Sequence, residues 1–155
     1  MSASLMSRLS ASSGLPYGDV YRIVQTAPLR YKIFFIEKRS GGMREIAQPA
    51  REVKLLQRLM AEELAEVLPV HDAATAYVTG GSVRKNAVKH AGSRFLLKMD
   101  FKDFFPSIQQ SDLEQHIAKH GGGKYSEVDV RAICHLALWV RNRQPPRILC
   151  IGAPS

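Results

Sequence analysis

The sequence has 155 residues, the size of one ordinary domain, and its composition excludes several classes of protein. Apolar residues make up 45% and charged residues 23%, values typical of a folded globular chain rather than a disordered or fibrous one. Lysine and arginine number 22 against 14 aspartate and glutamate residues, so the net charge is +8. This excess favours a polyanionic partner, either nucleic acid or an anionic membrane surface.

No run of residues approaches the roughly 18 apolar positions of a membrane-spanning helix. Cys134 and Cys150 match neither a C-x-x-C motif nor the spacing of a zinc site, so we expect no disulfide scaffold and a reducing cytoplasm. The serine-rich residues 1–14 lack the apolar centre of a secretory signal. We interpret them as a first helix or a loose lead-in.

Residues 31–48 predict a β-hairpin, because two apolar runs flank a Ser-Gly-Gly turn at 40–42. Pro49 then suits the first position of a helix. Apolar residues recur at three- and four-residue steps over 50–68, with charged residues mostly on the remaining faces. This spacing indicates an amphipathic helix.

The next stretch, 71–94, mixes a short extended piece, two glycines and a brief basic helix. Residues 95–99 (FLLKM) have the length and composition of a buried strand, which Asp100 closes. Ser111 and Glu114 form the pattern of a capping box and predict a helix that begins near residue 112.

Glycines 121–123 should end that helix, and Ser126 should begin another that runs to about Val140 and carries Trp139. Residues 147–151 predict a further strand. Helices segregated from short hairpins are typical of the α+β class.

Asp100 is the most informative candidate for catalysis. A carboxylate at the end of a buried strand lies on a rigid element beside a cleft, where a phosphoryl-transfer enzyme holds magnesium through oxygen ligands. The alternative is that Asp100 only caps a turn and Asp103 is a solvated acid, since aspartate is a common turn residue.

The string LLKMDFKDFFPSI at 96–108 resembles the first catalytic motif of reverse transcriptases, above all those of the bacterial retron and group II intron lineage. Residues 38–44 resemble the fingers hairpin, K-x-x-G-G-x-R. Residues 71–90 resemble the retron-type segment that joins fingers to palm, and 152–155 resemble the start of the Q-G-A-P-x-S-P motif. The four motifs follow one another in the order that such enzymes show.

This resemblance implies the fingers and partial palm of a right-hand polymerase, with helices packed on short antiparallel strands. Residues 1–30 would be an N-terminal helical lead-in, 31–94 the fingers and 95–155 the start of the palm. The remaining palm, with its paired aspartates, and the thumb are absent from the sequence. We therefore expect a fragment or a subunit that does not polymerise alone, because one carboxylate cannot hold two magnesium ions.

The resemblance also implies roles for single residues. Asp100 would be the catalytic metal ligand and the backbone carbonyl of Phe101 a second contact, in a two-Mg²⁺ site that residues outside this chain complete. Lys38 and Arg44 would hold the incoming triphosphate, which suits arginine because its planar fork binds two phosphate oxygens.

Phe105 matches the bulky residue that crowds the sugar 2′ position and so selects deoxynucleotides. We expect Phe104 or Phe105 in the core in either case. Gly152 opens the Gly-Ala-Pro motif and belongs to the nucleotide-binding set. Ile151 stands where many reverse transcriptases carry a glutamine, so the hydrogen bonds of that amide are missing.

Two groups of basic residues lie in stretches without any acid and are candidates for contacts to a template backbone. The first group is Arg84, Lys85, Lys89 and Arg94. The second is Arg131, Arg141, Arg143 and Arg147.

The function implied by the resemblance is RNA-directed DNA synthesis from deoxynucleoside triphosphates in the bacterial cytoplasm, with no membrane partner. A retron enzyme would copy a structured non-coding RNA into a branched RNA–DNA hybrid and would serve anti-phage defence, with a possible effector protein. Two other interpretations stay open. One is a reverse transcriptase of a group II intron or a diversity-generating element; the other is a non-catalytic RNA-binding module.

Overall fold

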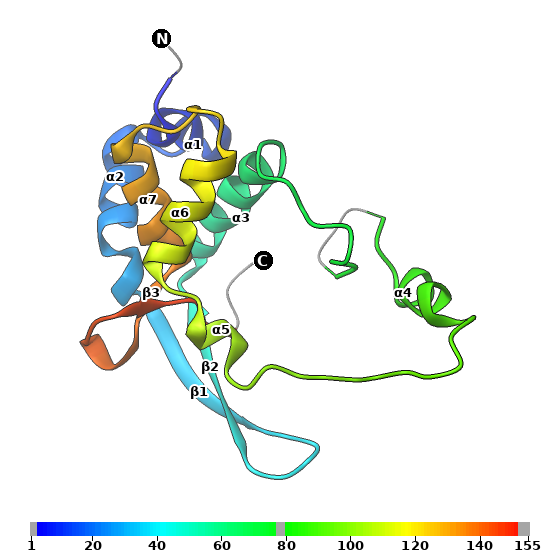
Figure 1. Cartoon of the computed structure of the whole chain (residues 1–155). Coiled ribbons are helices and arrows are strands. Elements are labelled where there is room, and N and C mark those ends of the chain that lie inside the picture. Colours follow the sequence, from blue (N-terminus) through cyan, green and yellow to red (C-terminus); the bar gives the residue numbers. More distant parts are fainter. Residues whose placement is uncertain (1–2, 77–79, 152–155) are drawn as a thin grey trace.

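The computed structural model describes residues 3–76 and 80–151 and confirms the α+β class. Most of its helices form one bundle (Figure 1), which consists of α1 (Leu5–Ser13), α2 (Tyr17–Thr26), α3 (Arg51–Ala65), α6 (Gln110–His120) and α7 (Glu127–Ala137). They share one apolar core, whose fully buried members include Leu5, Leu9, Val20, Val24, Val53, Leu56, Ile133 and Leu136. Residues 5–13 therefore form a packed helix and not a loose lead-in. The domain boundaries at 30 and 94 stay predictions.

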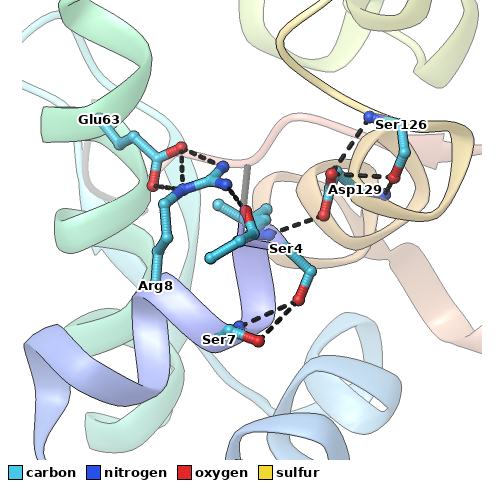
Figure 2. Close-up of polar contacts among 8 residues, drawn as sticks. Ser4, Ser7, Arg8, Glu63, Ser126 and Asp129 are labelled. Carbon is cyan, nitrogen blue, oxygen red and sulfur yellow. Dashed lines mark hydrogen bonds and ion pairs between the residues drawn. The ribbon is translucent and has the colours of Figure 1, made fainter. Parts of the chain in front are cut away.

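Polar contacts attach α1 to α3 and α7 (Figure 2). The Ser4 side chain caps α1 by accepting the backbone N–H of Ser7. The guanidinium of Arg8 pairs with the Glu63 carboxylate on α3 at 2.5 Å. Asp129 on α7 accepts the backbone N–H of Leu5 at 2.7 Å. Because the first N–H groups of a helix have no partner within it, the contact from Asp129 satisfies a donor that packing would otherwise leave buried and unpaired.

The hairpin is confirmed. Strands β1 (Tyr31–Glu37) and β2 (Met43–Pro49) pair antiparallel, with Tyr31 opposite Pro49 and Glu37 opposite Met43. Gly41 and Gly42 adopt φ values of 84° and 81°, a left-handed region that favours glycine. The prediction that Pro49 begins the helix is wrong: Pro49 is the last residue of β2, and α3 begins at Arg51.

A second small sheet pairs β3 (Trp139–Val140) with β4 (Arg147–Ile148), and the 3-10 helix η2 (Arg141–Arg143) lies between them. Another 3-10 helix, η1 (Ala27–Leu29), follows α2. The prediction of a helix through Val140 is wrong, because α7 ends at Ala137 and Trp139 pairs with Ile148 instead. The strand predicted over 147–151 is confirmed only in its first two residues.

The capping box of α6 is displaced from its predicted position. Gln109 and Asp112 form it, and the helix begins at Gln110. The predicted box of Ser111 and Glu114 does not form because Ser111 lies inside the helix, and the Glu114 carboxylate instead accepts a hydrogen bond from the Gln110 amide at 2.7 Å.

The strand predicted at 95–99 does not form. These residues are extended, without strand pairing, and they are exposed: 89% for Phe95 and 79% for Leu97. A strand needs a neighbour for its backbone N–H and C=O groups, and no described residue pairs with this segment. Helix α4 (Val83–His90) precedes it and buries none of its residues; Figure 1 shows α4 standing apart from the bundle. Helix α5 (Phe104–Ser107) follows it.

Candidate nucleotide and metal site

Lys38 and Arg44 lie on one face of the hairpin near its tip. Arg44 is directly opposite Ile36, and the Lys38 backbone N–H donates to the Gly42 carbonyl at 2.9 Å, which continues the pairing past β1. Residues two apart on a strand point to the same side, and so do directly opposite residues. Both side chains are exposed and form no ion pair with any described residue. Their charges are available to an anion.

The chain returns to this hairpin just before the Gly-Ala-Pro motif. The Ala47 backbone N–H donates to the Ile151 carbonyl at 3.0 Å, so residue 151 lies against the outer edge of β2. Ala47 is three residues from Arg44 along β2, or about 10 Å at the usual strand rise. Gly152 itself lies outside the described residues, as do the rest of its motif and residues 77–79 of the joining segment.

Phe105 is attached to the same region through the end of α5. The Leu149 backbone N–H donates to the Ile108 carbonyl at 3.1 Å, and Gln109 forms a bridge with Ile148. Phe105 is half-buried and meets the Phe104 ring edge-on, with 5.5 Å between the centroids. The prediction that one of these rings belongs to the core is wrong, because Phe104 is half exposed as well. Both rings retain surface that a ligand can contact.

Asp100 lies in the extended segment before α5, and its carboxylate is exposed. The rigid strand expected beneath it is missing. Asp100 forms no hydrogen bond or ion pair with any described residue, and the carbonyl of Phe101 follows it directly. These hard oxygen donors are of the type that Mg²⁺ prefers. Within residues 3–76 and 80–151, however, no group of three or more His, Cys, Asp or Glu side chains could hold a metal ion. Asp100 and Phe101 thus fit as part of a ligand set.

The first group of basic residues predicted to bind the template lies on and after α4, apart from the hairpin and α5. Arg84, Lys85 and Lys89 lie on α4, and Arg94 follows it, all exposed. Lys85 donates to the Gly80 carbonyl at 2.7 Å and Lys89 to the Asp72 carbonyl at 2.8 Å. The two arginines have no such partner among the described residues. Because α4 stands apart in Figure 1, the structure does not bring this group to Arg44 or Phe105.

Sequence reasoning missed the contacts that hold the hairpin base on the bundle. Gln57 is buried in α3 and donates both to the Tyr31 hydroxyl at 2.9 Å and to the Leu136 carbonyl at 2.7 Å. Burial raises the pKa of Tyr31 above its usual range. The only available signal was that Gln57 lies four residues after Val53, on the apolar stripe of the helix. The ion pair between Glu45 and Arg141, at 3.0 Å, had no sequence signal.

None of the helices in the described part of the chain is long and apolar enough to cross a membrane.

Sequence comparison with known proteins shows the family. The model of the family "Reverse transcriptase (RNA-dependent DNA polymerase)" matches residues 36–144. The chain is 35% identical over 142 residues to the retron Ec83 reverse transcriptase of Escherichia coli, which covers 90% of this chain and 45% of that protein. It is 35% identical over 138 residues to the retron Mx65 reverse transcriptase of Myxococcus xanthus, with 81% of this chain and 31% of that protein covered.

The retron Mx162 reverse transcriptase of Myxococcus xanthus is 40% identical over 109 residues, which are 70% of this chain and 22% of that protein. The chain therefore spans less than half the length of these relatives. The family match covers most of the chain, from the end of β1 to residue 144, and all three relatives are retron reverse transcriptases. This chain belongs to the reverse transcriptase family and is of the bacterial retron type.

Proposed function

We propose that this chain forms the fingers and the opening part of the palm of an RNA-directed DNA polymerase. The observation that carries the proposal is the hydrogen bond between Ala47 and Ile151, which holds the residue before the Gly-Ala-Pro motif against the strand of Arg44. Arg44 and Lys38 bind the triphosphate of the incoming deoxynucleotide. Two unpaired cations on one strand face suit an anion of several charges.

In this proposal Phe105 lies beside the sugar of the incoming nucleotide. Its ring is only half-buried, and its segment is held to β4 through Ile108 and Leu149. A flat aromatic ring excludes a 2′-hydroxyl by volume, so the site favours deoxynucleotides. Gly152 and the residues after it contact the base-paired nucleotide, with backbone groups in place of the amide that Ile151 lacks.

We propose Mg²⁺ as the cofactor, with the Asp100 carboxylate and the Phe101 carbonyl among its ligands. When bound, two such ions stabilise the attacking and leaving oxygens of an in-line phosphoryl transfer. The further carboxylates come from outside these 155 residues. The exposed, unpaired state of Asp100 supports this role, since no internal contact has to be broken before it binds a cation.

The retron relatives support a finer assignment. The template is a structured non-coding RNA, and a 2′-hydroxyl of that RNA primes synthesis, so that the product is a branched RNA–DNA hybrid. Arg84, Lys85, Lys89 and Arg94 contact the template backbone. The enzyme acts in the bacterial cytoplasm in defence against phage, together with an effector protein.

The test is Asp100→Asn in the full-length protein, at whatever length its own coding frame gives. DNA synthesis on an RNA template should fall to background, because an amide is a poor magnesium ligand, while affinity for the RNA stays within about twofold of the parent. Asp103→Asn is the matched control and should keep activity. Asp103 is also exposed, and asparagine tolerates its φ of 52° equally well. Full synthesis by the Asp100→Asn variant would refute the metal assignment.

A further inference from the structure

A cavity of about 530 Å³ lies between the start of α6, the second half of α7 and the strand β4. Gln109, Ser111, Arg131, His135 and Arg147 contribute to its walls. Its volume is in the range of pockets that hold small molecules or single nucleotides, roughly 300–1,000 Å³. It shares no lining residue with the candidate nucleotide and metal site.

Two of the four arginines of the second basic group line the cavity. Arg131 comes from α7 and Arg147 from β4, and neither forms an ion pair with any described residue. Arg141 of the same group is instead neutralised by Glu45 at 3.0 Å. No acidic residue lines the cavity among those described. Two arginines without an ion pair among the described residues therefore line one concave surface, and Arg131 also lines a neighbouring pocket with Glu114 and Glu127.

The remaining polar groups of the cavity suit the same kind of ligand. The side chains of Gln109, Gln110 and Ser111 bring amide and hydroxyl groups to the start of α6, where the helix dipole also favours an anion. Two acids of α6 near this end of the helix are hydrogen-bonded but keep their negative charge: Asp112 accepts the Gln109 backbone N–H and Glu114 accepts the Gln110 amide. Arginine forks with neutral donors beside them are a typical set of contacts to a phosphate.

His135 lines the same cavity and is close enough to Arg147 for its charge to act on the imidazole. Burial and, next, the charge of Arg147 lower the pKa of its imidazole, against an opposing effect of the Val24 and Gln25 backbone. Its Nδ1 is buried and has no hydrogen-bond partner in the described part of the chain. An anion bound between the arginines would offset the lowering of the His135 pKa by Arg147. Binding can therefore be followed by measuring the pKa of this imidazole.

We propose that this cavity binds a phosphate of the RNA backbone and anchors the template away from the site of synthesis. The proposal rests on the proposed function in one respect, that RNA is the bound template. A polymer is favoured over a free phosphate compound because the positive charge continues beyond the cavity. Arg143, exposed and without an ion pair among the described residues, lies on the connection that leads into the wall formed by Pro145 and Pro146.

The experiment measures binding of a fluorescein-labelled 20-nucleotide single-stranded RNA to the full-length protein by anisotropy, over a series of salt concentrations. The variant is Arg131→Gln with Arg147→Gln. The matched control, Arg51→Gln with Arg58→Gln, removes the same charge from two exposed arginines of α3 that have no ion pair in the described structure. Thermal unfolding of each protein checks that the fold is retained.

We expect the cavity variant to bind RNA several-fold more weakly than the control. We also expect the slope of log K against log salt to be smaller by about 0.7, since the cavity holds one phosphate and each phosphate contact to a single strand contributes about 0.7. Equal affinities and slopes for the two double variants would overturn the proposal. So would an unchanged RNA affinity in a cavity variant that has lost binding of AMP or inorganic phosphate, because the ligand would then be a free phosphate compound.

A second readout is the NMR titration of His135. Addition of the RNA should raise the pKa of His135 in the parent protein, and an unchanged value at saturating RNA would contradict the proposal. Failure of this proposal and failure of the proposed function give different results. The proposed function is tested by DNA synthesis with the Asp100→Asn variant, whereas this proposal is tested by RNA binding. A protein that makes no DNA can still bind RNA in this cavity, and a working polymerase can lack this anchor.

Discussion

The carboxylate of Asp129 and the backbone N–H of Leu5 are 2.7 Å apart, although 124 positions separate them in the chain. The same carboxylate accepts the Ser126 N–H at 3.1 Å and the Ser126 hydroxyl at 2.8 Å (Figure 2). One buried acid thus completes the N-terminus of its own helix and that of α1. This contact explains how the N-terminal helix α1 is held in the same core as α7.

Asp129→Asn should lower the free energy of unfolding by about 1–3 kcal/mol, because an amide cannot accept all three hydrogen bonds and its NH₂ group faces donors. Urea denaturation at equilibrium measures this. Asp19→Asn is the control: its carboxylate pairs with Arg22 at the surface, at 2.8 Å, and should contribute no more than about 1 kcal/mol. Equal losses in the two variants would show that the contact to Leu5 contributes little.

Stability should fall as the pH rises from 8 to 10. Burial raises the pKa of Cys134 from 9.0 to about 11, so in this window the thiol ionises in the unfolded chain and stays protonated in the folded one. The unfolded state then binds fewer protons, and the free energy of unfolding decreases, by about 1 kcal/mol for this group. Cys134→Ala should be less stable at pH 8 and should show a correspondingly smaller loss between pH 8 and 10. The same pH dependence in both proteins would argue against this assignment.

Phe105→Ala in the full-length protein should admit ribonucleotides. The half-buried ring is the proposed steric filter, and its removal should reduce the preference for deoxynucleotides by roughly tenfold or more. The measurement is kcat/KM for dGTP and GTP on the same template. Phe104→Ala, which removes the neighbouring half-exposed ring, should leave the preference intact. If only Phe104→Ala changes it, the filter belongs to that residue.

The arginines and lysines around α4 should differ in their effect on RNA binding. Arg84→Gln with Arg94→Gln removes two exposed charges without any hydrogen-bond partner among the described residues, and the salt slope of RNA binding should fall by about 1.4. Lys85→Gln with Lys89→Gln removes the same charge and also the bonds to the Gly80 and Asp72 carbonyls. We therefore expect this second variant to lose hydrogen-exchange protection in that segment as well. A salt-independent affinity in the parent protein would show that these charges only face solvent.

Local patterns were sufficient for several elements. The Ser-Gly-Gly turn between two apolar runs defined the hairpin, because glycine tolerates the left-handed conformation that Gly41 and Gly42 adopt. The 3.6-residue spacing defined α3, and Ser126 marked the start of α7 through its own capping box. The reverse-transcriptase motifs likewise needed no structure, since they are short strings of neighbouring residues.

Other features depended on partners distant in the chain. Trp139 belongs to β3 and not to the preceding helix because it pairs with Ile148. Residues 95–99 do not form a strand because no described strand pairs with them. The same holds for Gln57 under Tyr31 and for Arg131 beside Arg147 in one cavity. Propensity and periodicity report what a segment favours alone, whereas strand pairing, burial of polar groups and the meeting of charges depend on which surfaces the folded chain brings together.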